Sequence, residues 1–329
     1  MSAYLGIDIA KASFTVALRQ PKHSAVATAE FANTPLGFDQ LWRWLAARQV
    51  TSVHACLEAT GRYGMALATF LYDHDQPVSV VNPAQTKAFA KALALRTKTD
   101  RVDAKLLALF VQHLQPYRWS PPDPARSRLQ QLTRHRQVLL AAQQADRNRL
   151  QAGAVEPVLQ TFLQQRLALY AEQLVLLQAE IDAHIDAHAA LKRQHQLLDS
   201  IPGIGPVSAA ALLGELPDIR RFQRASQLVA YAGIDPSEHV SGSSVHKPTK
   251  ISKQGNARLR SALYFPGVSG MSRCRFYRSL VERLEAKRHC PMSIIVAVMR
   301  KQLHLVFGVL KHDCPFDPHY LEKKARAVA

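Results

Sequence analysis

The sequence is poor in acidic residues and in cysteine. It has 25 Asp or Glu among 329 residues against 42 Lys or Arg, so the net charge is +17 and the pI is near 10.0. Four cysteines without a Cys-x-x-Cys pair exclude a zinc knuckle and a disulfide scaffold. We find no apolar run of membrane length, no signal peptide and no lipidation motif, so we expect a cytoplasmic protein without a membrane partner.

The excess positive charge predicts a polyanionic partner, and nucleic acid is the first candidate. An acidic membrane surface is the alternative, but it calls for a basic amphipathic helix or an anchor. The positive charge is concentrated: residues 246–301 hold 13 Lys or Arg and only two acids, Glu282 and Glu285. A solvated basic face is the other explanation of this stretch, which we expect to contact a nucleic-acid backbone.

Residues 1–114 alternate between strand and helix patterns. No Gly-x-Gly-x-x-Gly follows the first strand, which argues against a dinucleotide-binding Rossmann domain. Three strands in a meander, then alternating strands and helices, predict an α/β RNase H-like (RuvC-like) domain over residues 1–122. The strands are expected near residues 4–9, 13–18, 27–32, 52–57 and 78–81, with helices beginning near Pro35, Arg62, Pro83 and Thr99.

Residues 123–196 are predicted to be helical, and Gly153 and Pro157 indicate two helices joined by a turn. The second helix carries a heptad seam of Leu163, Leu167, Tyr170, Leu174, Leu177 and Ile181. This seam fits a hairpin within the chain and an intermolecular coiled coil equally well. Residues 197–329 form the third expected domain, which is mostly α-helical.

Four acids form the first candidate site. Asp8 lies inside an apolar strand, where a carboxylate is costly unless it is paired, and Glu58 ends a second apolar strand. Asp100 and Asp103 share one helix face at i, i+3. Converging carboxylates suit Mg²⁺, and two such ions support phosphoryl transfer. The alternatives are an Asp8–Lys11 ion pair, Asp100 as a helix cap and a solvated Asp103.

Two further motifs lie in the basic C-terminal region. The run Ser200-Ile-Pro-Gly-Ile-Gly-Pro206 predicts a helix-hairpin-helix whose Gly203 and Gly205 bring backbone N–H groups to a phosphate; a plain helix–helix turn is the alternative. The second motif is the Gly/Ser run at residues 241–244, which is followed by several cations. It predicts a phosphate-binding loop, in which a serine could also serve as a nucleophile. The binding candidates there are Ser243, Ser244, Lys247, Lys250, Lys253, Arg258 and Arg260.

The chain resembles the DEDD transposases of the insertion-sequence "one-ten" group and the related Piv-type DNA invertases. The resemblance rests on ordered motifs from residue 4 to beyond 300. They are Gly6-Ile-Asp-Ile-Ala-Lys11, Glu58-Ala-Thr-Gly61, Asn82-Pro83, Lys98-Thr-Asp-Arg-Val-Asp-Ala104, Ser200 to Gly205, Tyr231-Ala-Gly233 with Pro236, and Ser241-Gly-Ser-Ser244.

The resemblance implies a RuvC-like domain with the metal tetrad Asp8, Glu58, Asp100 and Asp103, which we expect to bind two Mg²⁺ ions. It implies Ser241 as the nucleophile that forms a covalent phosphoserine, and a middle region used in oligomerisation. The implied partners are double-stranded donor and target DNA, a structured non-coding bridge RNA that guides recombination, and further copies of the chain as a dimer or a dimer of dimers. A bacterial, nucleoid-associated enzyme is expected.

Two other functions fit parts of the pattern. A hydrolytic RuvC-like endonuclease would use the tetrad alone, and a non-catalytic nucleic-acid-binding protein would use only the basic surface. The sequence does not specify the DNA sites, the RNA, transposition as against inversion, or which protomers share an active site.

Overall fold

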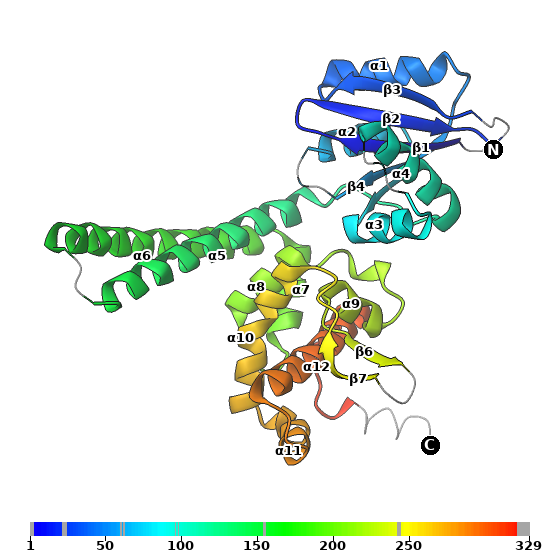
Figure 1. Ribbon diagram of the computed structural model, residues 1–329. Coiled ribbons are helices and arrows are strands. Elements are labelled where there is room, and N and C mark those ends of the chain that lie inside the picture. The colour runs from blue at the N-terminus through cyan, green and yellow to red at the C-terminus, as the bar shows by residue number, and fades with distance from the viewer. Residues whose placement is uncertain are drawn as a thin grey trace. The chain divides into compact units, whose positions relative to one another are not determined.

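The computed structural model describes residues 3–21, 25–59, 61, 63–95, 97, 99–153, 156–241 and 245–320. The chain divides into two compact units, Met1–Pro121 and Pro122–Ala329 (Figure 1). The further boundary that we expect near residue 196 stays a prediction.

The first unit is built on a mixed five-stranded sheet in the order β3-β2-β1-β4-β5. The first three strands form an antiparallel meander, and β1, β4 and β5 are parallel. The strands are β1 (Ala3–Ile9), β2 (Ser13–Arg19), β3 (Ala27–Ala32), β4 (Val53–Glu58) and β5 (Val78–Val81). The expected strands and their order are confirmed.

The helices of this unit are α1 (Pro35–Ala46), α2 (Met65–Asp73), α3 (Pro83–Ala92) and α4 (Asp100–Leu114). Three of them begin with a capping side chain that accepts a bond from a first-turn N–H: Thr34 for α1, Asn82 for α3 and Thr99 for α4. Proline follows the cap in α1 and α3, where its missing N–H costs nothing. Local sequence therefore fixes where each of these helices starts.

Helix α4 lies directly on the middle of β1 because Gly6 has no side chain. A Cβ on Gly6 would sit 2.0 Å from the carbonyl oxygen of Ala104 and 2.2 Å from the amide nitrogen of Ala108. Such a close approach of helix backbone to strand backbone is open only to glycine. The contact holds the first turn of α4 near the carboxyl end of β1.

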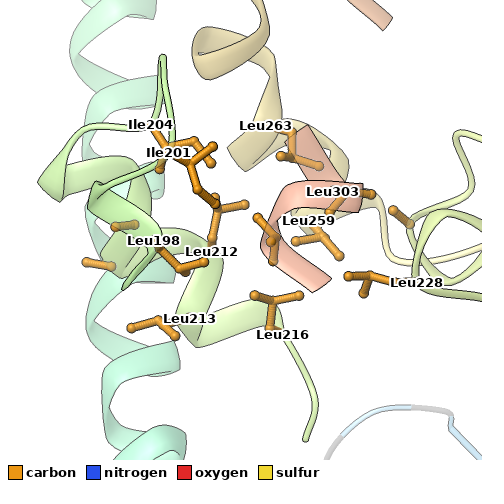
Figure 2. Packing of buried hydrophobic residues seen from close by; sticks show 14 of the residues in the cluster. Leu198, Ile201, Ile204, Leu212, Leu213, Leu216, Leu228, Leu259, Leu263 and Leu303 are labelled. Atoms are coloured by element: carbon orange, nitrogen blue, oxygen red, sulfur yellow. The ribbon is translucent and has the colours of Figure 1, made fainter. Parts of the chain in front are cut away.

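The second unit is mainly helical, which confirms the expected class. Its helices are α5 (Pro124–Gln151), α6 (Pro157–Asp186), α7 (Ala189–Asp199), α8 (Pro206–Glu215), α9 (Ala225–Ala232), α10 (Ala257–Arg273), α11 (Arg278–Ala286) and α12 (Pro291–His312), with short 3-10 turns at Ile219–Arg221 and Arg275–Tyr277. Figure 2 shows its core, where Leu198, Leu212 and Leu213 meet Leu259, Leu263 and Leu303 from α10 and α12.

The heptad seam of α6 packs within the chain. Helices α5 and α6 form a long antiparallel pair (Figure 1), and all six seam residues are half-buried or buried. The intramolecular alternative is therefore the one that this seam adopts. A second apolar stripe on α6 stays exposed: Leu159, Phe162, Leu169 and Leu176 are each about half exposed or more.

Two features of the second unit differ from expectation. Ser241 and Lys247 lie in two antiparallel strands, β6 (Pro236–Ser241) and β7 (Val245–Ile251), where we expected a loop. Helix α12 is also long and apolar enough to cross a membrane, although we expected no such run. Its residues Ile294, Val298, Leu303 and Val306 are buried in the protein core, which explains the apolar composition.

Candidate active site

The four predicted acids come from two strands and one helix and line a single pocket. Asp8 lies near the end of β1, Glu58 ends the adjacent parallel strand β4, and Asp100 and Asp103 occupy the first turn of α4. All four line a cavity of about 500 Å³ in the first unit. Parallel strands place their carboxyl ends at one edge of the sheet, and the α4–Gly6 contact brings the helix to that edge.

Negative charge accumulates in this pocket. Burial, followed by the charges of Asp100, Asp103 and Glu58, raises the pKa of Asp8 to about 6. No Lys or Arg among the described residues forms an ion pair with Asp8, so the Lys11 alternative has no support. Thr99, not Asp100, caps α4, which leaves the Asp100 carboxylate for the pocket.

The donor set fits a divalent cation. Four carboxylates offer only hard oxygen ligands, and burial together with the negative charge of the other three acids raises the pKa of Asp8. Among the described residues, no group of three or more His, Cys, Asp or Glu side chains is already spaced as metal ligands. The four acids therefore share one pocket without forming a preformed metal site.

The structure adds two pocket residues that the sequence reading missed, Thr86 and Lys87 of α3. Thr86 is buried, and its hydroxyl donates to a carboxylate oxygen of Glu58. Asn82-Pro83 signals the start of α3, but only the fold shows that its first turn reaches Glu58. Lys87 is exposed and is the one Lys or Arg among the described residues that line this pocket.

The candidate nucleophile lies in the second unit. Ser241 is the last residue of β6 and pairs with Val245 in the hairpin register. Its side chain lies outside the described part of the structure, as do those of Lys247 and of Ser243 and Ser244, whose backbone is also not described. The role of each of these residues stays a prediction.

Three of the predicted binding cations are exposed near this hairpin: Lys250 in β7, Lys253 in the following turn and Arg258 in α10. Arg260 differs, because its guanidinium donates to the backbone oxygen of Ala232 at 2.8 Å and to that of Gly255 at 3.4 Å. Arg260 is half-buried and ties α10 to the end of α9, so its side chain already serves the fold.

The turn that carries Gly203 and Gly205 joins α7 to α8, as expected. Gly203 has φ of 85°, in the left-handed region that favours glycine, and packs against Pro266 and Gly270 of α10. Gly205 precedes α8, and a Cβ there would meet nothing within 4 Å. Gly205 is thus open to a partner, whereas Gly203 is enclosed by the protein; the helix-hairpin-helix assignment stays a prediction.

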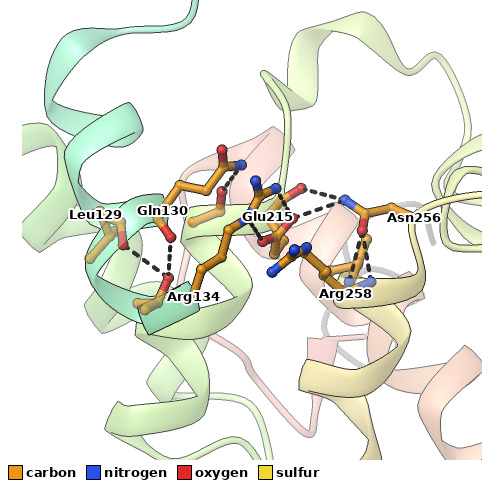
Figure 3. Close-up of polar contacts among 9 residues, drawn as sticks. Leu129, Gln130, Arg134, Glu215, Asn256 and Arg258 are labelled. Carbon is orange, nitrogen blue, oxygen red and sulfur yellow. Dashed lines mark hydrogen bonds and ion pairs between the residues drawn. The ribbon is translucent and has the colours of Figure 1, made fainter. Parts of the chain in front are cut away.

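A buried ion pair supports the base of the hairpin region (Figure 3). Glu215 of α8 is 3% exposed; Arg134 of α5 donates to both of its carboxylate oxygens, and Asn256 donates to one of them at 3.1 Å. The Asn256 side chain also caps α10 by accepting from the N–H groups of Arg258 and Leu259.

Comparison with known families matches both units. Residues 5–158 match the family described as "Transposase" in its DEDD form, and residues 195–280 match the "Transposase IS116/IS110/IS902 family".

Individual proteins agree with these matches. The chain is 33% identical to the "Pilin gene-inverting protein" of Moraxella bovis over 95% of this chain and 97% of that protein. It is 27% identical to a "Probable family 20 transposase" of Pseudomonas aeruginosa over 47% of this chain and 46% of that protein. The chain therefore belongs to the IS110 family of DEDD transposases, together with the pilin gene-inverting proteins.

Proposed function

We propose that this member of a family that cuts and rejoins DNA is an RNA-guided recombinase that works through a covalent phosphoserine at Ser241. The observation that carries the proposal is the pocket in which Asp8, Glu58, Asp100 and Asp103 meet and in which the pKa of Asp8 is raised to about 6. The strand order of the first unit supports the RuvC-like assignment.

Asp8, Glu58, Asp100 and Asp103 would hold Mg²⁺, two ions in our proposal. When bound, Mg²⁺ neutralises charge on the phosphate and on the oxygens that enter and leave. The protein's own contribution is to fix four acceptor side chains around one cavity, two from strand ends and two from a helix held by Gly6.

The serine step replaces one phosphodiester by another. The Oγ–P bond to Ser241 forms and the bond from phosphorus to the DNA 3′-oxygen breaks. The serine proton is released to water, and the departing 3′-oxygen takes up a proton from water to become a 3′-hydroxyl. The number of phosphoester bonds is unchanged, so a second strand can take over the phosphate without an external energy source.

The charge supports the nucleic-acid partners of this proposal, donor and target DNA and a guide RNA. The basic segment 246–301 supplies exposed cations beside the serine hairpin, including Lys250, Lys253 and Arg258. In an RNA-guided enzyme the protein binds backbone phosphates and base pairing selects the sequence, which requires a broad positive surface. Because its substrate would be bacterial DNA, we propose that the protein acts in the cytoplasm, at the nucleoid.

The second α6 stripe supports self-association as a dimer or a dimer of dimers. Phe162, Leu169 and Leu176 are spaced by seven residues, the repeat of a coiled coil, and they are exposed because the first seam already packs on α5. A second copy of the chain would cover them.

The test incubates the protein with Mg²⁺, its RNA and nicked target DNA and resolves the products on a denaturing gel. We expect a protein-linked DNA band that is lost in Ser241→Ala and in Asp8→Asn. Cleaved DNA ends without an adduct, unchanged in Ser241→Ala, would contradict the proposal and favour hydrolysis. Purification without RNA at low salt would contradict RNA guidance.

A hydrolytic RuvC-like endonuclease is the second candidate, and the complete carboxylate tetrad favours it, since such a pocket can activate water by itself. Site-specific inversion is a further outcome of the same chemistry, favoured by the likeness to the pilin gene-inverting protein. A substrate with two recombination sites in inverted orientation separates inversion from transposition by the order of the products.

A further inference from the structure

We propose that Thr86 is a positioning residue that holds the carboxylate of Glu58 in the orientation needed for metal binding. This inference rests on the proposed metal site and adds a residue to it. Thr86 lies in α3, on neither the strands nor the helix that carry the four acids.

The position of Thr86 follows from the chain path. Strands β4 and β5 are parallel, with Glu58 opposite Val81 in the register. Asn82 caps α3 immediately after Val81, so the first turn of the helix must lie above the end of β4. Residue 86 is the first α3 position to be buried there, with 1% exposure, and it meets the Glu58 side chain.

Thr86 has one hydroxyl proton and two acceptors within reach, a Glu58 carboxylate oxygen and the carbonyl oxygen of Pro83 at 3.0 Å. An ionised carboxylate is the stronger acceptor, so the bond to Glu58 prevails. Because the hydroxyl engages one carboxylate oxygen, Oε1, the other oxygen remains available to the pocket.

Partners of this kind matter for metal affinity. Groups that hydrogen-bond to a metal ligand fix its rotamer, and their loss typically costs about 10- to 100-fold in affinity or activity. In Thr86→Val the shape is kept and the donor is lost, so a carboxylate oxygen of the half-buried Glu58 faces a methyl group. We expect Glu58 to rotate away from its position in the pocket.

The experiment measures two Mg²⁺ midpoints for the full-length protein. The first is the MgCl₂ concentration at half of the rise in melting temperature, and the second is the Mg²⁺ concentration for half-maximal DNA cleavage. For Thr86→Val we expect both midpoints to rise about 10-fold. Thr86→Ser keeps the hydroxyl and should restore both midpoints to near wild type.

Thr133→Val is the matched control, because Thr133 is also a buried helical threonine and donates to the Leu129 carbonyl at 2.9 Å, in the other unit. It should lower the melting temperature without shifting either Mg²⁺ midpoint. A wild-type Mg²⁺ midpoint in Thr86→Val, or a shift in Thr86→Ser as large as in Thr86→Val, would overturn the inference.

Failure of the metal site itself gives a different result. If wild type shows no Mg²⁺-dependent rise in melting temperature, or if Asp8→Asn shows the same rise, the proposed metal site is wrong. If Thr86→Val does not fold, the comparison of Thr86→Ser with Thr86→Ala at the same temperature replaces it, with the shift expected only in Thr86→Ala.

Discussion

At the residue scale, the pocket brings together four carboxylates whose mutual repulsion is unfavourable for folding. Asp8 is half-buried beside three other carboxylates, and its pKa is raised to about 6. A group held in this way destabilises the folded protein in the absence of a cation, a frequent cost of active sites. The same arrangement attracts a divalent cation.

The first prediction follows from this charge. Asp8→Asn should raise the free energy of unfolding in metal-free buffer by about 1 kcal/mol, a value reduced for the solvent screening of a half-buried group. The same substitution should abolish DNA cleavage and the Mg²⁺-dependent rise in melting temperature. Urea unfolding with EDTA measures the first effect. Asp39→Asn, at an exposed position of α1, is the control; a destabilised Asp8→Asn would contradict the charge argument.

The second prediction concerns His54 in β4. Burial, followed by the charge of Arg118, lowers its pKa, and its Nε2 is 2.8 Å from the Ser79 hydroxyl. The folded state thus binds the proton less well than the unfolded state, whose histidine titrates near 6.5. The contribution of His54 to the stability of the first unit should be complete above that pH and be lost as the pH falls below it, whereas protonation of Asp8 acts in the opposite direction. Thermal unfolding between pH 7.5 and 5 should therefore show a stability that falls more, or rises less, in wild type than in His54→Gln; identical pH profiles would exclude His54 as a contributor.

At the element scale, sequence predicted what is local. The starts of α1, α3 and α4 and the five strands were predicted from the sequence, so Asp8, Glu58, Asp100 and Asp103 could be placed on elements that converge. What depends on contacts between distant segments was missed.

Thr86 illustrates the limit, because nothing in its neighbourhood along the chain distinguishes it from other helical threonines. Its partner Glu58 lies 28 residues away. The sequence also left open whether the α6 seam packs within the chain or against another chain. The reason is the same, because periodicity shows that a helix face is apolar but not which surface covers it.

The third prediction tests the contact between β1 and α4. Gly6→Ala should lower the free energy of unfolding by about 3 kcal/mol, because the new methyl group meets the α4 backbone and neither backbone can move without cost. Cleavage should fall as well, since α4 carries Asp100 and Asp103. Gly308→Ala is the control: it lies in α12 with open space around it, and better helix propensity should stabilise it by about 0.5 kcal/mol. A wild-type stability for Gly6→Ala would show that the contact is looser than described.

The fourth prediction concerns the exposed stripe of α6. The double substitution Leu169→Glu and Leu176→Glu should reduce the oligomer to a smaller species, because two charges at heptad spacing cannot be buried between copies. Light scattering coupled to size-exclusion chromatography measures the mass. Gln164→Glu adds a charge at an exposed polar position of α6 outside this stripe and should leave the mass unchanged. A monomeric wild type, or an unchanged mass in the double variant, would contradict association through this stripe.

At the scale of the whole molecule, charge is divided unevenly along the chain. The acidic pocket lies in the first unit, and 13 cations against two acids lie in residues 246–301 of the second. Substrate phosphates are repelled by the carboxylates unless a cation intervenes. We therefore expect the metal-binding acids and the main DNA-binding surface to lie in different units, and DNA affinity to be governed by the charge of the second.

The fifth prediction concerns the effect of that charge on the salt dependence of DNA binding. Affinity for duplex DNA should fall steeply with salt, and the slope of log K against log salt should lose about 0.9 for each phosphate contact removed. The double variant Lys250→Ala and Arg258→Ala, at two exposed cations, should therefore reduce the slope by about 2. Arg193→Ala is the matched control, because Arg193 pairs with Asp313 at 3.1 Å and is already neutralised. Fluorescence anisotropy across a range of KCl concentrations gives the slopes. Equal slopes for wild type and the double variant would show that the DNA backbone contacts another surface.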